Sequence, residues 1–589
     1  MLKKFTRRLL HPFEHPNLLP GQPLSPLDAT AERLGVPLTD ALFIEGGPAA
    51  RLGATFARFI GDEDGARAVK KEFHVVLEKR LRAVALRLDP AENHGLERLP
   101  LGELGHPLDK FAWDALSKDY PEAGSGQKYE AGIINRFRQI VSLLIWAGAF
   151  MGLSFLIFLR HGRAGVTPVR TTFVTTDFWG NEFWGAFQDA VKENGDWTKD
   201  SLLLVRERGD SGMDDVPFPD VNPSDFHVPR WEWLRHSIGA GFRLVGEVLY
   251  LALREVRDSR NIEVAIRIFI VAIMTLNARR IAYNLHAKWY VDIMDYSAYH
   301  CVKASVFRKI GTRLIGWPYH QFDSPGSTLS YLNYDLFIAG GNYQYREYGA
   351  GWSAKTRNVA VGQLRNDRRI AYSKHLDPDI ANKIMARKEA GDQIAVLFAD
   401  NDSPGWHAGG MSLYRTVLPL LAGRKGWFLI IKQKKPPKPN GVLEQIQADP
   451  KVGSLLSTDN ILLVPRETAD EDVCPAAWLI ERMDLGVSLP GTIQWESLAK
   501  AKPHLAYFPV NQETAAVSDL KKNRLLVETT KELRERLVEL MEDPASCIYD
   551  LERLREDFDD YADDQALGRI AKILFGSQDP MNLPSGQFG

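Results

Sequence analysis

The sequence predicts an α/β protein in which two domains with parallel sheets follow one another, with a helical module in front of them. From residue 165 onward, short apolar runs of strand length alternate with helical stretches, as in βαβ units. This alternation breaks once, at 368–390, and then resumes. The chain has 589 residues, which is several times the length of one domain.

The composition excludes several classes of protein. Hydrophobic residues make up 45% and charged residues 25%, as in ordinary globular proteins rather than disordered or collagen-like chains. The formal charge of −2 gives no global positive field for nucleic acid. Cys301, Cys474 and Cys547 lie far apart and form no CxxC, so a disulfide framework or a structural zinc site is disfavoured and a reducing compartment is favoured.

Residues 1–137 are predicted to form a mostly helical and partly irregular N-terminal module. The first 60 residues are rich in Pro and Gly and indicate an irregular arm with one or two small elements. Residues 62–88 read as one helix, with Val69 and Phe73 on its apolar side and lysines and arginines on the other. Such a basic face is usually solvated, and contact with anionic lipid is the alternative.

An apolar helix is predicted at 138–164, either associated with a membrane or buried. The run IVSLLIWAGAFMGLSFLIFL at 140–159 carries no charge and is long enough to cross a bilayer. Arginines flank it on both sides, which fixes no orientation and also suits an in-plane segment at an anionic leaflet. Gly148 and Gly152 form a GxxxG, a weak signal of a helix-contact face. A second apolar run, 264–276, contains a central Arg267 and reads as a buried helix.

Residues 165–385 are predicted to form the first Rossmann-like domain. Helices are expected at 182–194, at 297–310 and in two stretches that end near residue 285. The predicted strands are 171–176, 201–207, 289–295, 311–318 and 334–341.

Residues 386–545 are predicted to form the second Rossmann-like domain, followed by C-terminal helices and a tail at 546–589. The expected helices are 411–423, 474–483 and 492–501. The expected strands are 393–400, 427–434, 460–465, 485–490 and 504–509.

The first motif that could carry chemistry is VSLPGT at 487–492. It places a strand end, a glycine-containing turn and a helix start in succession, and backbone N–H groups at a helix N-terminus hold phosphate oxygens. Glu496, one turn further on, could reach a sugar hydroxyl. The alternative is that Gly491 only makes a tight turn and Thr492 only caps a helix.

A second motif, FLIIKQKKPPKP at 428–439, brings lysines to the end of a strand. Alternation places Lys432 and Lys434 on one side of the strand, where two ammonium groups could neutralise a nucleotide phosphate without a metal. The alternative is a solvated basic edge strand. A third strand-to-helix loop, DNDSPGWHAGG at 400–410, is predicted to face the same cleft.

On these motifs the second domain resembles the nucleotide-binding half of GT-B glycosyltransferases, especially those of bacterial capsule and surface-carbohydrate synthesis. The matching segments are KQKKP at 432–436 and VSLPGTIQWESLAKAKPHLAYFP at 487–509. Lys435 stands where such enzymes carry a histidine, which argues against CMP-sugar donors. The resemblance implies a GT-B fold and phosphate or donor contacts by Lys432, Lys434, Ser488, Gly491, Thr492 and Glu496.

The first domain matches the acceptor half of such enzymes more loosely, through GTRLIGWPYHQFDSPG at 311–326 and through 362–367, where Arg365 is the interdomain residue. Sugar transfer with inversion needs a base that removes the acceptor proton. His320 has a suitable side chain and lies just beyond a predicted strand. Asp323 could orient or replace it, and Asp177 is the other candidate. The alternative for His320 is a polar loop position without a catalytic task.

The leading functional prediction is transfer of a sugar from a nucleotide-sugar donor to a surface polysaccharide or glycolipid at the cytoplasmic face of the inner membrane, with attachment through 140–159. A cytoplasmic location is the alternative. The nucleotide-sugar is a substrate, and no cofactor or metal is expected, since no convincing DxD or ligand cluster occurs. Two other functions remain open: a CDP-polyol phosphotransferase of the teichoic-acid type, and a non-catalytic polysaccharide-assembly scaffold. NAD chemistry is disfavoured because no GxGxxG follows a predicted strand.

Overall fold

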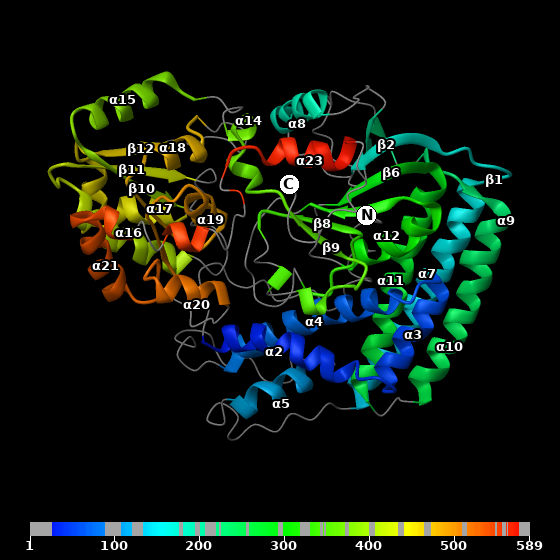
Figure 1. Cartoon of the computed structure of the whole chain (residues 1–589). Coiled ribbons are helices and arrows are strands. Elements are labelled where there is room, and N and C mark those ends of the chain that lie inside the picture. Colours follow the sequence, from blue (N-terminus) through cyan, green and yellow to red (C-terminus); the bar gives the residue numbers. More distant parts are fainter. Residues whose placement is uncertain are drawn as a thin grey trace.

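The predicted fold class is confirmed: two parallel sheets, each covered by helices, lie side by side in the chain (Figure 1). The structure is a computed structural model. It describes residues 26–88, 108–119, 133–175, 181–194, 201–205, 220–222, 225–254, 258–292, 298–317, 330–341, 345–346, 349–371, 376–399, 407–433, 441–464, 473–508, 515–547, 551–555, 561 and 563–576.

The first sheet has seven parallel strands in the order β4-β3-β2-β6-β7-β8-β9. The chain moves outward from β2 through β3 to β4 and then returns to β6 on the other side, so the strand order switches between β2 and β6. Ligands of open α/β sheets bind at such a switch point, beyond the carboxyl ends of the strands. The strands are β2 (Val169–Thr175), β3 (Leu202–Val205), β4 (Asp220–Val221), β6 (Leu285–Asp292), β7 (Arg313–Gly316), β8 (Leu336–Ala339) and β9 (Arg357–Ala360).

The second sheet has six parallel strands in the order β12-β11-β10-β13-β14-β15, with its switch point between β10 and β13. Alternate residues of its central strands enter hydrophobic cores on opposite faces, as a parallel sheet covered on both sides requires. The strands are β10 (Gln393–Ala399), β11 (Trp427–Gln433), β12 (Ile461–Val464), β13 (Leu485–Ser488), β14 (His504–Tyr507) and β15 (Leu526–Val527).

The helices of the second domain follow the predicted alternation. One of them, α15 (Pro378–Glu389), runs through the predicted domain boundary between residues 385 and 386 and buries Ile384 against the second sheet. The predicted interruption at 368–390 is therefore largely helical. The other elements are α16 (His407–Leu421), α17 (Val442–Ala448), η7 (Gly453–Ser457), α18 (Ala476–Arg482), α19 (Thr492–Ala499), α20 (Ala515–Lys522), α21 (Thr530–Glu542) and η8 (Pro544–Cys547).

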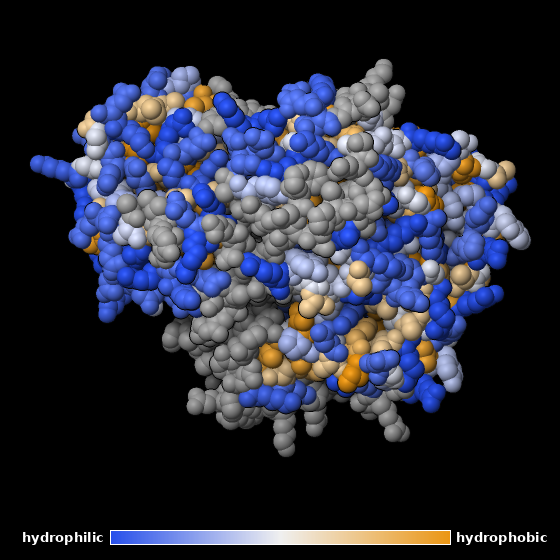
Figure 2. Space-filling view, in the orientation of Figure 1, coloured by the Kyte–Doolittle hydropathy of each residue, from blue (hydrophilic) through white to orange (hydrophobic). Residues whose placement is uncertain are grey.

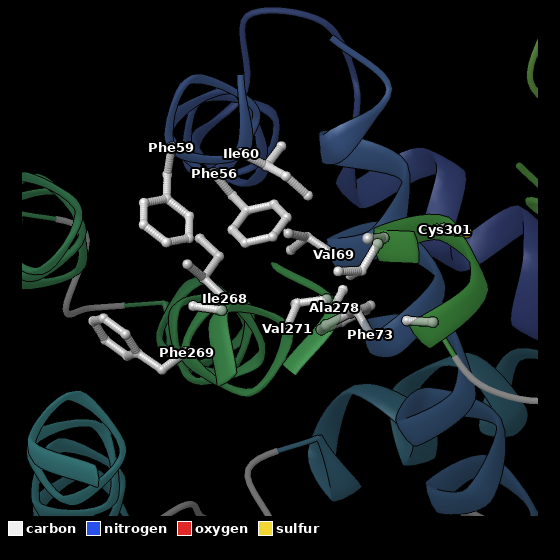
Figure 3. Packing of buried hydrophobic residues seen from close by; sticks show 14 of the residues in the cluster. Phe56, Phe59, Ile60, Val69, Phe73, Ile268, Phe269, Val271, Ala278 and Cys301 are labelled. Carbon is white, nitrogen blue, oxygen red and sulfur yellow. The ribbon is translucent and has the colours of Figure 1, made fainter. Parts of the chain in front are cut away.

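The N-terminal helices and the first sheet share one hydrophobic core. Figure 3 shows Phe56 and Phe59 packed above Ile268 and Phe269 of α11 (Ser259–Asn284). The prediction of an irregular arm for the first 60 residues is wrong over the described part, 26–60, which forms two helices. Their apolar faces are buried against later helices, and this burial stabilises them despite a composition rich in Pro and Gly. The helices are α2 (Pro26–Leu42), α3 (Pro48–Ile60), α4 (Gly65–Leu88) and α5 (Asp109–Asp119).

The two predicted apolar helices have different surroundings. Helix α11 is 72% buried, and Arg267 forms an ion pair with Glu263 one turn before it, which confirms the buried helix predicted at 264–276. Helix α7 (Ile133–His161) is only 33% buried over 139–161. The remaining elements of this part of the chain are β1 (Gly162–Arg163), β5 (Val228–Pro229), α9 (Arg230–Trp233), η3 (Leu234–Gly239), α10 (Ala240–Arg254), α12 (Tyr299–Phe307), η4 (Arg308–Ile310) and η5 (Gly349–Gly351).

The last described helix, α23 (Ala566–Phe575), returns to the first domain, where it lies beside α8 (Asn181–Asn194) (Figure 1). The indole N–H of Trp289 donates a hydrogen bond of 2.9 Å to the carbonyl of Leu574. The chain therefore passes between the domains twice, once after β9 and once before α23. In Figure 2 the visible face of the second domain is mostly hydrophilic, whereas hydrophobic residues gather on the helical lower part of the first domain.

Candidate functional site

A row of side chains crosses the second sheet near the carboxyl ends of its strands. Lys432 of β11 pairs in register with Phe398 of β10, which pairs with Ser488 of β13. Register partners in a parallel sheet point to the same face. The row thus places Lys432 and Ser488 on either side of β10, next to the switch point. Both are buried, at 4% and 1% exposure.

Beneath this row, His504 of β14 joins β13 to α19. The Ser488 hydroxyl lies 2.8 Å from its Nε2, and the Ser497 hydroxyl lies 2.8 Å from its Nδ1. The imidazole also stacks on the ring of Phe398, with centroids 5.7 Å apart. Ser497 donates its only proton to the carbonyl of Ile493, at 2.8 Å. His504 must therefore carry its proton on Nδ1 and accept on Nε2 the proton of Ser488.

Burial lowers the pKa of His504 to about 3, so the imidazole is neutral at physiological pH. In this arrangement Ser488 has no hydroxyl proton left for a phosphate oxygen. Its predicted contact with phosphate would require the bond to His504 to be broken, and that contact stays a prediction. Sequence reasoning missed His504 because its two partners come from the neighbouring strand β13 and from α19, the helix that precedes β14.

The predicted phosphate-binding turn leads directly into α19. Gly491 is the N-cap residue, in an extended conformation, and no side chain caps the helix. Thr492 is therefore the first helical residue. It is not the N-cap residue that the alternative interpretation of this turn predicted. Glu496 lies one turn further along and is 5% exposed. Because glycine has no side chain, the N-cap residue itself cannot satisfy the backbone N–H groups at the start of this helix.

The two domains meet at α19. After β9, the short helix η6 (Leu364–Asn366) ends at Asn366, whose side-chain amide donates to the carbonyl of Glu496 at 3.2 Å. The segment that leaves the carboxyl end of β9 thus touches the helix that follows the carboxyl end of β13, so the two carboxyl edges adjoin at this point (Figure 1). Arg365, the predicted interdomain residue, belongs to η6, and its side chain lies outside the described part of the chain.

Next to η6, Asp367 fixes the C-terminal helix to this junction. Its carboxylate is fully buried and accepts the backbone N–H groups of Leu567, at 2.7 Å, and of Arg369, at 3.0 Å. Burial raises the pKa of Asp367, and the hydrogen bonds only partly oppose that effect. The junction is completed by α14 (Arg368–Ala371).

At the carboxyl end of the central strand β6 lies a buried ion pair that the sequence did not predict. Asp292, the last residue of β6, lies 3.1 Å from the ammonium group of Lys303 on α12, and each is 2% exposed. The ammonium group also lies 4.3 Å from the ring centroid of Tyr299. The available signal was an aspartate that ends an apolar strand at the switch point. The pair places one negative and one positive group at this edge, and the two charges neutralise each other.

The predicted catalytic residues Asp177, His320 and Asp323, and the predicted phosphate neighbour Lys434, lie outside the described residues. The chain approaches them from Thr175 at the end of β2 and from Trp317 just after β7. These strands flank β6 on either side. The predicted roles of the four residues stay predictions.

Within the described part of the chain, no group of three or more His, Cys, Asp or Glu side chains is placed to hold a metal ion. Cys301, Cys474 and Cys547 are buried and form no disulfide.

No family model matches the sequence, and no curated protein matches it. Several solved structures have a similar fold. The MnaA protein of S. aureus, solved with UDP, is 14% identical and aligns with 71% of this chain and 100% of its own, with a TM-score of 0.44. A putative UDP-N-acetylglucosamine 2-epimerase from Listeria monocytogenes is 12% identical, with coverages of 72% and 100% and a TM-score of 0.44. The wall teichoic acid polymerase TagF is 12% identical, with coverages of 75% and 97% and a TM-score of 0.36. At these identities the likeness concerns the fold.

Proposed function

We propose that this protein is a glycosyltransferase that moves a sugar from a nucleotide-sugar to a surface polysaccharide or glycolipid. The observation that carries the proposal is the hydrogen bond from Asn366 to the carbonyl of Glu496. It joins the carboxyl edges of two switch-point sheets, which is where doubly wound domains bind their ligands. A donor held by one sheet could then meet an acceptor held by the other.

On the donor side, the proposal uses the cationic end of β11 and the start of α19. The ammonium group of Lys432 and the backbone N–H groups after Gly491 would stabilise the negative charge that develops on the departing nucleotide. Glu496 would accept hydrogen bonds from a ribose or sugar hydroxyl. Lys434 follows β11 and would supply a second positive charge. No step of this scheme is routed through a metal ion.

On the acceptor side, the base would come from the loops that follow β2 and β7. His320 is the first candidate because an imidazole titrates near neutral pH and can take the acceptor proton as the bond to the sugar forms. Asp323 and Asp177 are the alternatives. The acceptor would be presented at the cytoplasmic face of a membrane, to which the first domain attaches.

The donor site can be tested by thermal shift with UDP-, GDP-, dTDP- and CMP-sugars. A ligand that binds only the native state raises the melting temperature by mass action. Lys432→Met is expected to abolish the shift that one of these donors produces. The matched control is Lys425→Met, because Lys425 is exposed in the turn just before the amino end of the same strand. The proposal fails if no donor shifts the wild-type protein or if the two variants behave alike.

The chemistry is tested by product analysis and by His320→Ala. Loss of a general base is expected to lower kcat by about 10²–10⁴-fold while the donor-induced thermal shift is retained. A phosphodiester product from a CDP-polyol, instead of a glycoside, would assign the protein to the phosphotransferases. Unchanged polysaccharide production in cells that carry His320→Ala together with Glu496→Ala would favour the scaffold.

A further inference from the structure

Two antiparallel helical segments carry a continuous apolar surface on the outer edge of the first domain, away from the second domain (Figure 1). On α7 the exposed apolar residues recur at intervals of three and four and so form one stripe. On α9 and α10 a second stripe lies beside it, and the rings of Phe155 and Phe242 join the two at a centroid distance of 6.2 Å. We call this surface the outer apolar face; it comprises Phe137, Val141, Leu144, Ile145, Phe155, Leu156, Leu159, Trp231, Phe242, Tyr250 and Leu253.

The glycines of α7 belong to this face. Gly148 and Gly152 are exposed, and a Cβ atom built on either would meet no atom within 4 Å. Among the described residues they therefore form no helix contact, contrary to one expectation for a GxxxG pattern. Gly246 of α10 is equally open. At these three glycines the face is therefore not covered by any described part of the chain.

The opposite side of α7 excludes a transmembrane orientation for this helix within the fold. Leu143, Phe150 and Ile157 are 2%, 0% and 7% exposed, and this buried stripe spans most of the helix. It packs against α11, which covers the first sheet. Because α11 in turn covers the first sheet, α7 could cross a bilayer only by leaving this core. Only its outward side is available, so lipid contact has to be parallel to the membrane plane.

The charge around the face favours an anionic partner. Segments 133–163 and 228–254 hold eight arginines and two glutamates, a net charge of +6, whereas the whole chain has a formal charge of −2. Arg160, Arg163, Arg230 and Arg235 gather at one end, where β1 pairs with β5. One of the two glutamates, Glu247, is already paired with Arg58 of α3 at 2.6 Å.

We infer that α7, α9 and α10 dock flat on the surface of an anionic phospholipid bilayer. The apolar stripes would enter the boundary between headgroups and acyl chains, and the arginines would lie against lipid phosphates. This deepens the proposed function by naming the surface through which the first domain meets the membrane, and it replaces a spanning segment at 140–159 with an in-plane one. Vesicle binding needs no nucleotide, so its failure and the failure of donor binding are distinguishable.

Sedimentation of the purified full chain with phosphatidylcholine vesicles, with and without phosphatidylglycerol, tests the inference. Binding is expected to vesicles that contain phosphatidylglycerol and to weaken at high salt. Leu144→Glu with Leu159→Glu is expected to lower the partition coefficient at least about tenfold, since each change removes apolar contact and adds a charge. The matched control is Ile44→Glu, because Ile44 is as exposed, at 60%, but lies between α2 and α3, off the face.

A second variant separates the electrostatic part of the binding. Arg163→Gln with Arg235→Gln is expected to lower affinity for the anionic vesicles about thirtyfold and to leave residual binding to neutral vesicles unchanged, at about 1 kcal/mol for each arginine. The inference is overturned if the wild-type protein ignores anionic vesicles or if Ile44→Glu weakens binding as much as the double glutamate variant. A third outcome would also overturn it: the wild-type protein is a dimer that does not bind vesicles, and the double glutamate variant is a monomer. The face would then join two copies of the chain.

Discussion

The buried imidazole of His504 should make the second domain sensitive to mild acid, and His504→Gln should remove that sensitivity. The pKa of His504 is about 3 in the folded protein because of burial, against about 6.5 for an exposed histidine. Below pH 6.5 the unfolded chain therefore binds a proton that the folded chain refuses. Folding stability is lost as the pH falls from 6.5 towards 3. Between pH 7 and pH 5 this one linkage lowers the free energy of unfolding by about 2 kcal/mol.

Glutamine is the informative replacement because its amide can donate to one serine and accept from the other, yet does not titrate. Urea unfolding at pH 7 and pH 5, followed by circular dichroism with linear extrapolation, measures the difference directly. His504→Gln is expected to lose about 2 kcal/mol less than the wild type between the two pH values. The control is His286→Gln, because His286 is exposed on β6, and it should follow the wild type. Equal losses for wild type and His504→Gln would refute the reasoning.

Three further substitutions test buried contacts in the first domain, in the N-terminal helices and beside His504. Ile570→Ala, in the fully buried face of α23, should lower the unfolding free energy of the first domain by about 2–4 kcal/mol in urea titrations, although the residue follows the second domain in sequence. Arg80→Met removes the two hydrogen bonds of 2.6 and 2.7 Å that Arg80 donates to the fully buried Asp109 and should cost about 3–5 kcal/mol, seen as a lower Tm. Gly486→Ala puts a Cβ atom 2.6 Å from Nδ1 of His504 and should cost about 1–3 kcal/mol; an unchanged Tm would show that the ring can move aside.

The sheets could be predicted because their strands have a recognisable sequence pattern. All seven residues of β11 are buried, and the first five, 427–431, form an apolar run after a turn signal, which indicates a parallel strand covered on both faces. The position of Lys432 near the end of that strand followed from the same pattern. The helices at 26–60 escaped prediction because the Pro and Gly content of this segment favours an irregular arm. In α3, however, Pro48 starts the helix, Gly61 ends it, and Leu52, Phe56 and Phe59 recur at helical spacing on its buried face.

The hydrogen bonds inside the site could not be predicted from the sequence, because they join residues that are distant along the chain. Ser488 and His504 are sixteen positions apart and meet only because β13 and β14 pair with Gly486 opposite His504. Register of this kind depends on the assembled sheet. The return of α23 to the first domain is a second case, since the bond between Trp289 and Leu574 joins positions 285 residues apart.

The two proposals assign different tasks to the two domains, and the chain's connectivity links them. Helix α7 passes through the short strand β1 into β2, whose carboxyl end at Thr175 lies at the switch point of the first sheet. The surface that we infer to lie on lipid thus continues directly into the sheet that we propose for the acceptor. The Lys432 row belongs to the other domain, on the far side from α7 and α10 (Figure 1). An acceptor carried in the membrane and a donor dissolved in the cytosol would therefore approach the junction at Asn366 and Glu496 from opposite sides, so loss of membrane docking should raise the requirement for acceptor without changing the affinity for donor.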